Sequence, residues 1–265
     1  MSTRGQRRPA TGRHRTYKTA TDHPDLRAVL FDLDDTLFDH QASSRAGLTS
    51  LREGFPVLAG VPFDAFEQSY RVIMEEIHLL VLSGEITPTV ARERRFRRFL
   101  SETFPASLED AQHAAQLYHR GFHASRRPIE GAQELLRHLR ERVRIGVITN
   151  NVRHEQVDKL RHLELEPLVD VLVTSEETGV AKPHPDIFHS ALKQLDCTAD
   201  QVVMVGDNWV NDIVGASGVG IRGIWLNRYG EPHIDAALAP EILALAPLEE
   251  IAALIGAQLV VAPAP

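Results

Sequence analysis

The sequence predicts an α/β protein in which strands and helices alternate to build a doubly wound parallel sheet, with a helical insert after the first strand. Two observations support this fold class. Five short apolar runs are separated by amphipathic segments with helical spacing. In addition, roughly 110 residues separate the first two runs, far more than one crossover connection needs, and this interval has helical periodicity of its own.

The apolar runs are the predicted strands, because each is short, rich in aliphatic residues and bounded by polar or turn residues. They occupy residues 27–32, 143–149, 169–174, 201–206 and 221–226. Between and after them, helices are predicted at residues 131–142, 151–163, from Pro185 onward, 209–217 and 248–255. Pro185 suits a first helical position, and Gly218 suits a helix end.

The insert is predicted to be helical because apolar side chains recur in it every three or four residues, at Phe66, Tyr70, Ile73, Ile77 and Leu80. Thr87 followed by Pro88 is typical of a helix start, as is Ser107 with Asp110 three residues later. We therefore expect a helical insert at residues 41–126, within a core formed by residues 25–40 and 127–258.

Charge and composition exclude several classes of protein. The formal net charge of −7 argues against a generally basic nucleic-acid binder, and no apolar run reaches the roughly 18 residues that a membrane span needs. The single cysteine, Cys197, excludes an internal disulfide and suits a reducing compartment, so the expected location is cytoplasmic. Residues 1–24 are predicted to be a disordered basic arm, for which a nucleic-acid tether is the less favoured alternative, and residues 259–265 a flexible tail.

Acidic residues follow the first predicted strand. Asp32 and Asp34 stand two positions apart at its carboxyl end, where parallel sheets bind ligands. One carboxylate there can attack phosphorus as a nucleophile, and the other can protonate a leaving oxygen and then activate water. The alternative is an acidic turn whose side chains only bind the neighbouring backbone.

Polar residues also follow the next strands. Thr149 and Asn150 can hold a phosphoryl oxygen together with backbone N–H groups, or simply begin the following helix. Lys182, which precedes a proline, can keep nearby carboxylates ionised and offset phosphoryl charge, or be a solvated loop lysine. Asp207 and Asp212 offer the hard oxygen ligands that Mg²⁺ prefers, or favourable charges at a helix start.

In this order, the four segments resemble the motifs of the haloacid dehalogenase-like hydrolase superfamily. The matching stretches are FDLDDT at 31–36, ITN at 148–150, AKPHPDIF at 181–188 and GDNWVNDI at 206–213, and the resemblance extends over residues 26–230. It implies a Rossmann-like parallel sheet of strand order 5-4-1-2-3, and it identifies the insert as a C1-type cap.

The resemblance also implies a role for each acidic motif residue. Asp32 would be the nucleophile and a direct Mg²⁺ ligand. Asp34 would be the acid and base, with its backbone carbonyl as a second metal ligand. Asp207 would be the remaining protein ligand, and Asp212 would orient a metal-bound water or Lys182 from behind.

Further roles fall on the polar residues of the motifs. Thr149 and Asn150 would bind the phosphoryl group, Lys182 would screen its charge, and Thr36 would brace the first loop. Asp35 stands where many relatives have glycine, which affects the flexibility of the loop and not the chemistry.

Three sequence features narrow the branch of the family. Dehalogenase members lack an acid at the position of Asp34, so this chain resembles the phosphotransfer members. Phosphomutases of similar architecture have a cap-side histidine shortly after the first motif, where this chain has Ser43 and Ser44, although His40 lies close by. The segment 174–188 is similar to a branch that contains pyrimidine 5'-nucleotidases and N-acylneuraminate-9-phosphatases.

In that branch, specificity comes largely from the cap. Arg92, Arg95 and Phe99 share a helix face, which can hold an anionic or base-bearing substrate or simply face water. His119 and His123 are spaced to chelate a metal, but a solvated helix face is the favoured interpretation because no third ligand lies nearby in the sequence.

We therefore predict Mg²⁺-dependent hydrolysis of a small phosphate monoester through an aspartyl-phosphate, with a nucleoside 5'-monophosphate as first substrate and a sugar phosphate as second. A phosphomutase and a catalytically idle binding protein are the alternatives, although idle members usually lack one of the residues Asp32, Asp34, Lys182 and Asp207, all present here. No membrane partner is expected, nucleic-acid binding is disfavoured, and the sequence predicts no oligomeric state.

Overall fold

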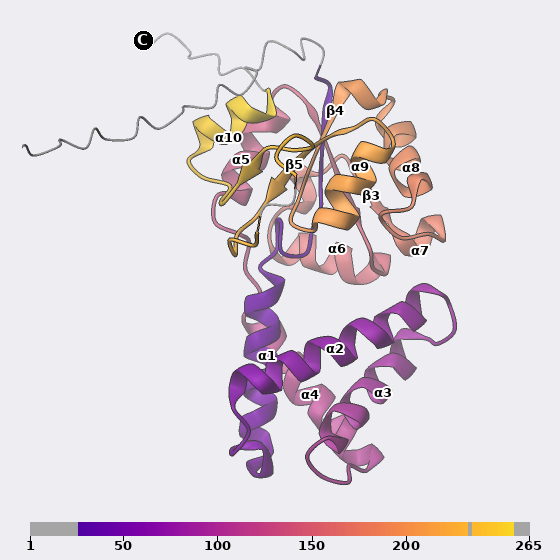
Figure 1. The fold of residues 1–265 in the computed structure, drawn as a ribbon, viewed down its shortest axis with the longest axis vertical. Helices are drawn as coiled ribbons and strands as arrows, with labels where there is room; N and C mark the ends of the chain where they lie inside the picture. Colours follow the sequence, from indigo (N-terminus) through magenta and orange to yellow (C-terminus); the bar gives the residue numbers. More distant parts are fainter. Residues whose placement is uncertain (1–25, 233–234, 257–265) are drawn as a thin grey trace, which may run out of the picture.

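The structure is a computed structural model that describes residues 26–232 and 235–256, so the predicted arm at 1–24 and tail at 259–265 lie outside the described residues. Within these ranges, six strands form one parallel sheet in the order β3-β2-β1-β4-β5-β6 (Figure 1). The strands are β1 (Ala28–Phe31), β2 (Arg144–Thr149), β3 (Val171–Thr174), β4 (Val202–Gly206), β5 (Arg222–Leu226) and β6 (Glu241–Ile242). The predicted order 5-4-1-2-3 is confirmed, since it is the same succession read from the opposite edge, and β6 extends it.

Helices surround the sheet, and a separate group of helices lies beyond the carboxyl ends of its strands (Figure 1). They are α1 (His40–Gly54), α2 (Phe63–Leu82), α3 (Pro88–Ser101), α4 (Leu108–Ala124), α5 (Ala132–Arg140), α6 (Arg153–His162), α7 (Ser175–Thr178), α8 (Pro185–Leu195), α9 (Gly215–Gly218) and α10 (Leu248–Ile255). Short 3-10 turns, η2 (Pro56–Leu58), η3 (Glu166–Leu168) and η4 (Ala199–Gln201), and a π-helical segment, η5 (Trp209–Val214), complete the described elements. None of the helices in the described ranges is long and apolar enough to cross a bilayer.

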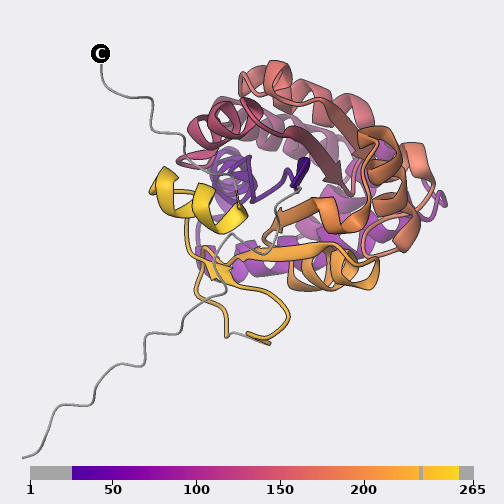
Figure 2. The same ribbon diagram turned by 90° about the horizontal axis from the view of Figure 1, so that it is seen from above.

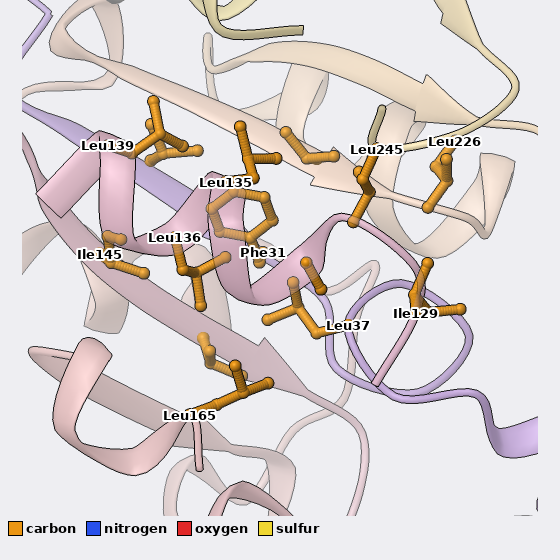
Figure 3. Packing of buried hydrophobic residues seen from close by; sticks show 14 of the residues in the cluster. Phe31, Leu37, Ile129, Leu135, Leu136, Leu139, Ile145, Leu165, Leu226 and Leu245 are labelled. Carbon is orange, nitrogen blue, oxygen red and sulfur yellow. The ribbon is translucent and has the colours of Figure 1, made fainter. Parts of the chain in front are cut away.

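The sheet is buried on both faces, as its continuous apolar strands predict. Along β1, Val29 and Phe31 face one core cluster, while Ala28 and Leu30 face another. The first cluster includes side chains of α5 and α10, and Figure 3 shows Phe31 packed among the leucines of α5. The second cluster includes α8 and α9, so helices cover both sides of the sheet (Figure 2). Each large buried side chain contributes about 1.5–3 kcal/mol through its burial.

The helices α1 to α4 have a hydrophobic core of their own. Four of the five apolar residues that predicted the helix α2 are buried in it, and Leu80 is the partly exposed exception. The predicted helix starts are confirmed: Thr87 accepts a hydrogen bond from the Val90 N–H at the start of α3, and Ser107 and Asp110 form a reciprocal capping box before α4.

Strand register brings the predicted motifs to one edge of the sheet. Phe31 at the end of β1 lies opposite Val147 of β2 and Val205 of β4. Asp32, Thr149 and Asp207, which stand one or two residues further along their chains, therefore meet at the carboxyl edge.

Candidate active site

A buried ion-pair network joins the first, third and fourth motifs. The Lys182 ammonium contacts Asp32 Oδ1 at 2.5 Å and Asp212 Oδ1 at 2.7 Å, and it donates a hydrogen bond to the Ile148 carbonyl at 2.9 Å. No more than 9% of any of the three charged side chains is exposed. Because an unpaired buried charge is costly, each of these groups holds the others in place.

Burial and neighbouring charges set the ionisation of this network. Burial is the largest influence on Asp32 and, with the Asp212 carboxylate, raises the pKa of Asp32 to about 7 against the opposing effect of Lys182. Although burial disfavours its charged form, Asp212 and Asp32 raise the pKa of Lys182 above its usual value. Burial, followed by the charges of Asp32 and Asp212, raises the pKa of Asp207 well above its usual value. The three carboxyl groups therefore have too few positive charges around them to balance their negative charge.

This shortage of positive charge fits a divalent cation. Carboxylate oxygens of Asp32, Asp207 and Asp212 lie within 4.8 Å of one another. Among residues 26–232 and 235–256, Lys182 is the one lysine whose ammonium contacts this cluster, so two of the three negative charges stay unbalanced. Clustered hard oxygen ligands of this kind suit Mg²⁺.

The loop of the first motif is tied to the fourth motif. The Thr36 hydroxyl donates to Asp207 Oδ1 at 3.2 Å and accepts from the Asp207 N–H at 3.0 Å. The Trp225 indole N–H donates to the Asp207 carbonyl at 2.7 Å. Asp35 has a φ of 63°, in the left-handed region that glycine adopts without strain. Its carboxylate accepts a hydrogen bond from the Gln41 N–H at the start of α1, at 2.8 Å.

Gly206 makes room for the Asp212 side chain. A Cβ at Gly206 would lie 2.3 Å from Asp212 Oδ2, closer than two such atoms can approach. The same oxygen accepts a hydrogen bond from the Asn208 N–H at 3.0 Å. Asp212 sits in the π-helical segment η5 rather than in the regular helix that the sequence predicts, and π-helical turns are frequent at functional sites.

Asp34 has a partner that the sequence did not indicate. The Lys159 ammonium contacts both of its carboxylate oxygens, at 2.5 and 2.8 Å. Lys159 belongs to α6, is nearly buried, and lies 5.2 Å from the centre of the Phe38 ring. Burial favours the neutral acid, but Lys159 and then His40 outweigh it and lower the pKa of Asp34 below its usual value.

Thr149 and Asn150 lie where β2 ends, but their side chains have different surroundings. Thr149 is buried and lines the smaller cavity described below. The Asn150 amide lines it as well, but is engaged with the Lys182 backbone, accepting from its N–H at 2.7 Å and donating to its carbonyl at 2.9 Å. Its own carbonyl lies 3.1 Å from His78 Nε2 of α2. Asn150 therefore orients the loop that carries Lys182.

Two cavities meet at this edge of the sheet. The smaller, of about 170 Å³, is lined by the motif residues, including Asp32, Lys182 and Asp207. The larger, of about 470 Å³, lies between the helices α2 to α4 and the α6 side of the core. Asp34 lines both cavities. A ligand that reaches from one cavity into the other therefore passes beside its carboxylate.

The larger cavity brings together several residues of the helical insert. Arg92 and Arg95 line it, as does His40. Phe99, expected on the same face as these arginines, is instead buried in the insert's core, with its ring centre 4.6 Å from that of Phe66. It points inward because α3 packs on α2 through its aromatic side chains.

His119 and His123 stack with ring centres 3.8 Å apart in the wall of the larger cavity. Among the described residues, the cluster of three or more potential metal ligands is formed by Asp32, Asp207 and Asp212, and it contains neither histidine. Trp209, for which the sequence left rim and core open, is buried with its ring centre 5.2 Å from that of Trp225.

Comparison with known proteins places the chain among phosphate-ester hydrolases. A glyceraldehyde 3-phosphate phosphatase of Pyrococcus abyssi is 32% identical over 208 residues, 78% of this chain and 83% of that protein. The pyrimidine 5'-nucleotidase YjjG of Escherichia coli is 31% identical over 205 residues, 76% of this chain and 86% of that protein. The N-acylneuraminate-9-phosphatase of Rattus norvegicus is 26% identical over 235 residues, 84% of this chain and 92% of that protein. The predicted similarity to this branch is thereby confirmed.

A solved structure supports the same assignment. The HAD-hydrolase YfnB of Bacillus subtilis, bound to magnesium, aligns with a TM-score of 0.70 at 27% identity, over 85% of this chain and 98% of that one. The family profile itself matches residues 26–220, which include all four motifs. The chain therefore belongs to the haloacid dehalogenase-like hydrolase family.

Proposed function

We propose that the protein is a Mg²⁺-dependent phosphatase, which hydrolyses a small phosphate monoester through an aspartyl-phosphate at Asp32. One observation supports this most directly. Asp32 lies in the carboxylate cluster beside Lys182, and Asp34 lines both the small polar cavity and the larger one. A phosphoryl group in the small cavity would thus have a nucleophile on one side and an acid beside its leaving oxygen.

The reaction has two steps. In the first, an Asp32 oxygen attacks phosphorus, the bond to the leaving oxygen breaks, and Asp34 gives that oxygen a proton. In the second, Asp34 takes a proton from water, whose oxygen attacks phosphorus and releases Asp32 and inorganic phosphate. A phosphate dianion beside Asp34 raises its pKa, which counteracts Lys159 and favours the acid form for the first step.

The remaining site residues would take the roles that the family resemblance implies. The carboxylates of Asp32 and Asp207 and the carbonyl of Asp34 would hold Mg²⁺, with Asp212 behind them. The ion, when bound, offsets charge on the phosphoryl oxygens. Lys182 adds positive charge at the same place, and the buried Thr149 hydroxyl offers a hydrogen bond to a phosphoryl oxygen.

Two substrate classes are candidates. Similarity to a pyrimidine 5'-nucleotidase supports nucleoside 5'-monophosphates, and similarity to a glyceraldehyde 3-phosphate phosphatase supports sugar phosphates. A cavity of about 470 Å³ is within the usual size range of small-molecule sites. Residues 41–126 would act as a cap that excludes water from this cavity and sets the substrate, in an enzyme that we expect in the cytoplasm.

The test is phosphate release from nucleotides, sugar phosphates and phosphoglycolate, with Mg²⁺ and with EDTA. We expect release that requires Mg²⁺ and is abolished in Asp32→Asn. Asp34→Asn should slow both steps while Mg²⁺ affinity, measured by calorimetry, stays nearly unchanged, because only its carbonyl would face the ion. Product that remains esterified after phosphoryl transfer would indicate a phosphomutase, and no reaction with any ester would indicate an idle binding protein.

A further inference from the structure

One cation in the wall of the larger cavity is balanced by no carboxylate of the described residues. Its wall carries three carboxylates, and each already contacts a cation, in the pairs Lys159–Asp34 at 2.5 Å, Arg126–Asp158 at 2.5 Å and Arg92–Glu155 at 4.0 Å. The fourth formal cation of the wall is Arg95 of α3. In the described ranges, no carboxylate lies within ion-pair distance of Arg95, so the cavity has one unmatched positive charge.

Aromatic rings hold the Arg95 guanidinium in place. Its central carbon lies 5.0 Å from the ring centre of Phe96, 5.5 Å from that of Tyr70 and 5.9 Å from that of Tyr118. This packing keeps water from much of the group, and the shielded Nε has no hydrogen-bond partner in the described part of the chain. A partly desolvated guanidinium binds an anion more strongly than an exposed one, because less water must be displaced.

A second donor without an acceptor lies in the same wall. Tyr70 is 3% exposed, and its hydroxyl has no hydrogen-bond partner among the described residues. Burial, with the neighbouring Tyr118, raises the pKa of Tyr70 well above its usual value against the opposing effect of Arg95, so the hydroxyl stays protonated and can donate a hydrogen bond. An unmatched cation beside an unused donor is the arrangement that a carboxylate or phosphate oxygen satisfies.

We propose that Arg95, assisted by Tyr70, binds a second anionic group, a carboxylate or a phosphate, on the leaving group of the substrate. The proposal rests on the proposed function, since it takes the ester phosphate to lie in the smaller cavity. Because Asp34 lines both cavities, the leaving group that it protonates extends into the cavity of Arg95. The preferred substrates are then acidic sugar phosphates or sugar bisphosphates.

The same geometry disfavours a nucleoside as leaving group. A neutral base would leave the charge of Arg95 unmatched. The rings nearest to Arg95 also offer little surface on which a base could stack, because Tyr70, Phe96 and Tyr118 are at most 9% exposed and pack against one another in the insert's core.

Matched pairs of esters test the proposal. For a carboxylate, 6-phosphogluconate is compared with sorbitol 6-phosphate, which has an alcohol in place of the acid. For a phosphate, fructose 1,6-bisphosphate is compared with fructose 6-phosphate, and uridine 5'-monophosphate represents the neutral base. Each is assayed for kcat/KM with the wild type, Arg95→Met, Tyr70→Phe and the control Arg98→Met, whose arginine lies exposed on α3 and pairs with Glu76.

We expect the wild type to prefer the anionic member of at least one pair, and the pair shows whether carboxylate or phosphate is recognised. Arg95→Met should lower kcat/KM for that member about 10- to 100-fold, as for loss of a charge-assisted hydrogen bond, and leave its neutral partner within about twofold. Tyr70→Phe should cause a smaller loss of the same kind, and Arg98→Met none. Equal rates on both members, or equal losses on both in Arg95→Met, would overturn the proposal.

Binding separates this proposal from the proposed function. Calorimetry on Asp32→Asn, with and without Arg95→Met, measures the affinities of the same esters without turnover. Arg95-dependent binding of the anionic ester in a protein that hydrolyses nothing would refute the phosphatase assignment alone. Hydrolysis with no anion preference, or binding that Arg95→Met leaves unchanged, would refute the anion site alone.

Discussion

Replacing Lys182 by methionine tests whether the site network is held together by charge. Methionine has a similar length, so the packing is largely kept while the ammonium is lost. Asp32 and Asp212 then remain buried without the cation that lies 2.5 and 2.7 Å away in the wild type. Removing one partner of a buried ion pair costs about 3–5 kcal/mol, a large part of the roughly 5–15 kcal/mol that stabilises a typical domain.

We therefore expect Lys182→Met to lower the free energy of unfolding by about 3–5 kcal/mol at pH 8 in EDTA. This loss of stability should become smaller as the pH is lowered. The neighbouring carboxylates raise the folded-state pKa of Lys182, so its contribution is fully present below the unfolded pKa and constant between pH 5 and 8. In the variant, however, the unpaired buried acids take up protons more readily when folded than when unfolded, which favours the folded state as the pH falls.

The assay is equilibrium urea unfolding of the wild type, Lys182→Met and the control Lys193→Met, whose lysine is exposed on α8. The control should change stability by no more than about 0.5 kcal/mol. Mg²⁺ should reduce the difference in the free energy of unfolding between Lys182→Met and the wild type, because the variant's carboxylate cluster has one more unbalanced negative charge. A loss below about 1 kcal/mol in EDTA at pH 8 would refute the account of Lys182 as the charge that holds the cluster together.

Three further changes test other parts of the structure. Gly206→Ala should displace Asp212 from Lys182, because the new Cβ would lie 2.3 Å from Asp212 Oδ2. The rate of phosphate release should then fall at least about tenfold. The control Gly218→Ala, whose new Cβ has nothing within 4 Å, should leave the rate unchanged. Ser107→Ala removes the capping box of α4 and should cost about 0.5–2 kcal/mol in urea unfolding; an unchanged midpoint would contradict it. Burial, then His119 and Arg126, lower the pKa of His123 to about 4. Neutral His123 therefore contributes to the free energy of unfolding above its unfolded-state pKa of about 6.5, and this contribution is lost as the pH falls toward 4. His123→Gln should make the decline in the free energy of unfolding between pH 7 and 4.5 less steep.

The sheet could be predicted from the sequence because its strands are buried on both faces. In β1 to β5, polar residues stand only at the ends of a short apolar run, and the carboxyl ends of parallel strands must meet at one edge. This placed the motif residues together before any contact was known. The strand β6 could not be predicted, because its two residues, Glu241 and Ile242, are too few to show a pattern.

The partners of the site residues were harder to predict. Lys159 lies 125 positions from Asp34, and a lysine in a helix is usually solvated. One signal was available: Val152, Gln156, Lys159, Leu160 and Leu163 share a buried stripe of α6 and its ends. A lysine within such a stripe needs a buried carboxylate. The sequence does not say which one, since that depends on where the first loop leaves the sheet.

Helical spacing also misjudged one face of the insert. It placed Arg92, Arg95 and Phe99 together, but Phe99 points into the insert's core while the arginines line the cavity. The three do lie on one face, but Phe99 stands one turn further along the helix axis than Arg95, where α3 packs on Phe66 of α2. Only this packing decides where along the helix the cavity ends and the insert's core begins. The aromatic surroundings of Arg95 likewise come from three different helices and leave no local sequence pattern.

In the proposed function, Asp32 carries the phosphoryl group during turnover. The most direct measurement is a rapid acid quench of the wild-type enzyme with Mg²⁺ and its best ester, followed by peptide mapping by mass spectrometry. We predict a phosphoryl adduct on Asp32 that forms and decays at rates compatible with turnover, is removed by hydroxylamine and is absent in Asp32→Asn. A phosphoryl adduct on another residue, or full turnover by Asp32→Asn, would contradict it.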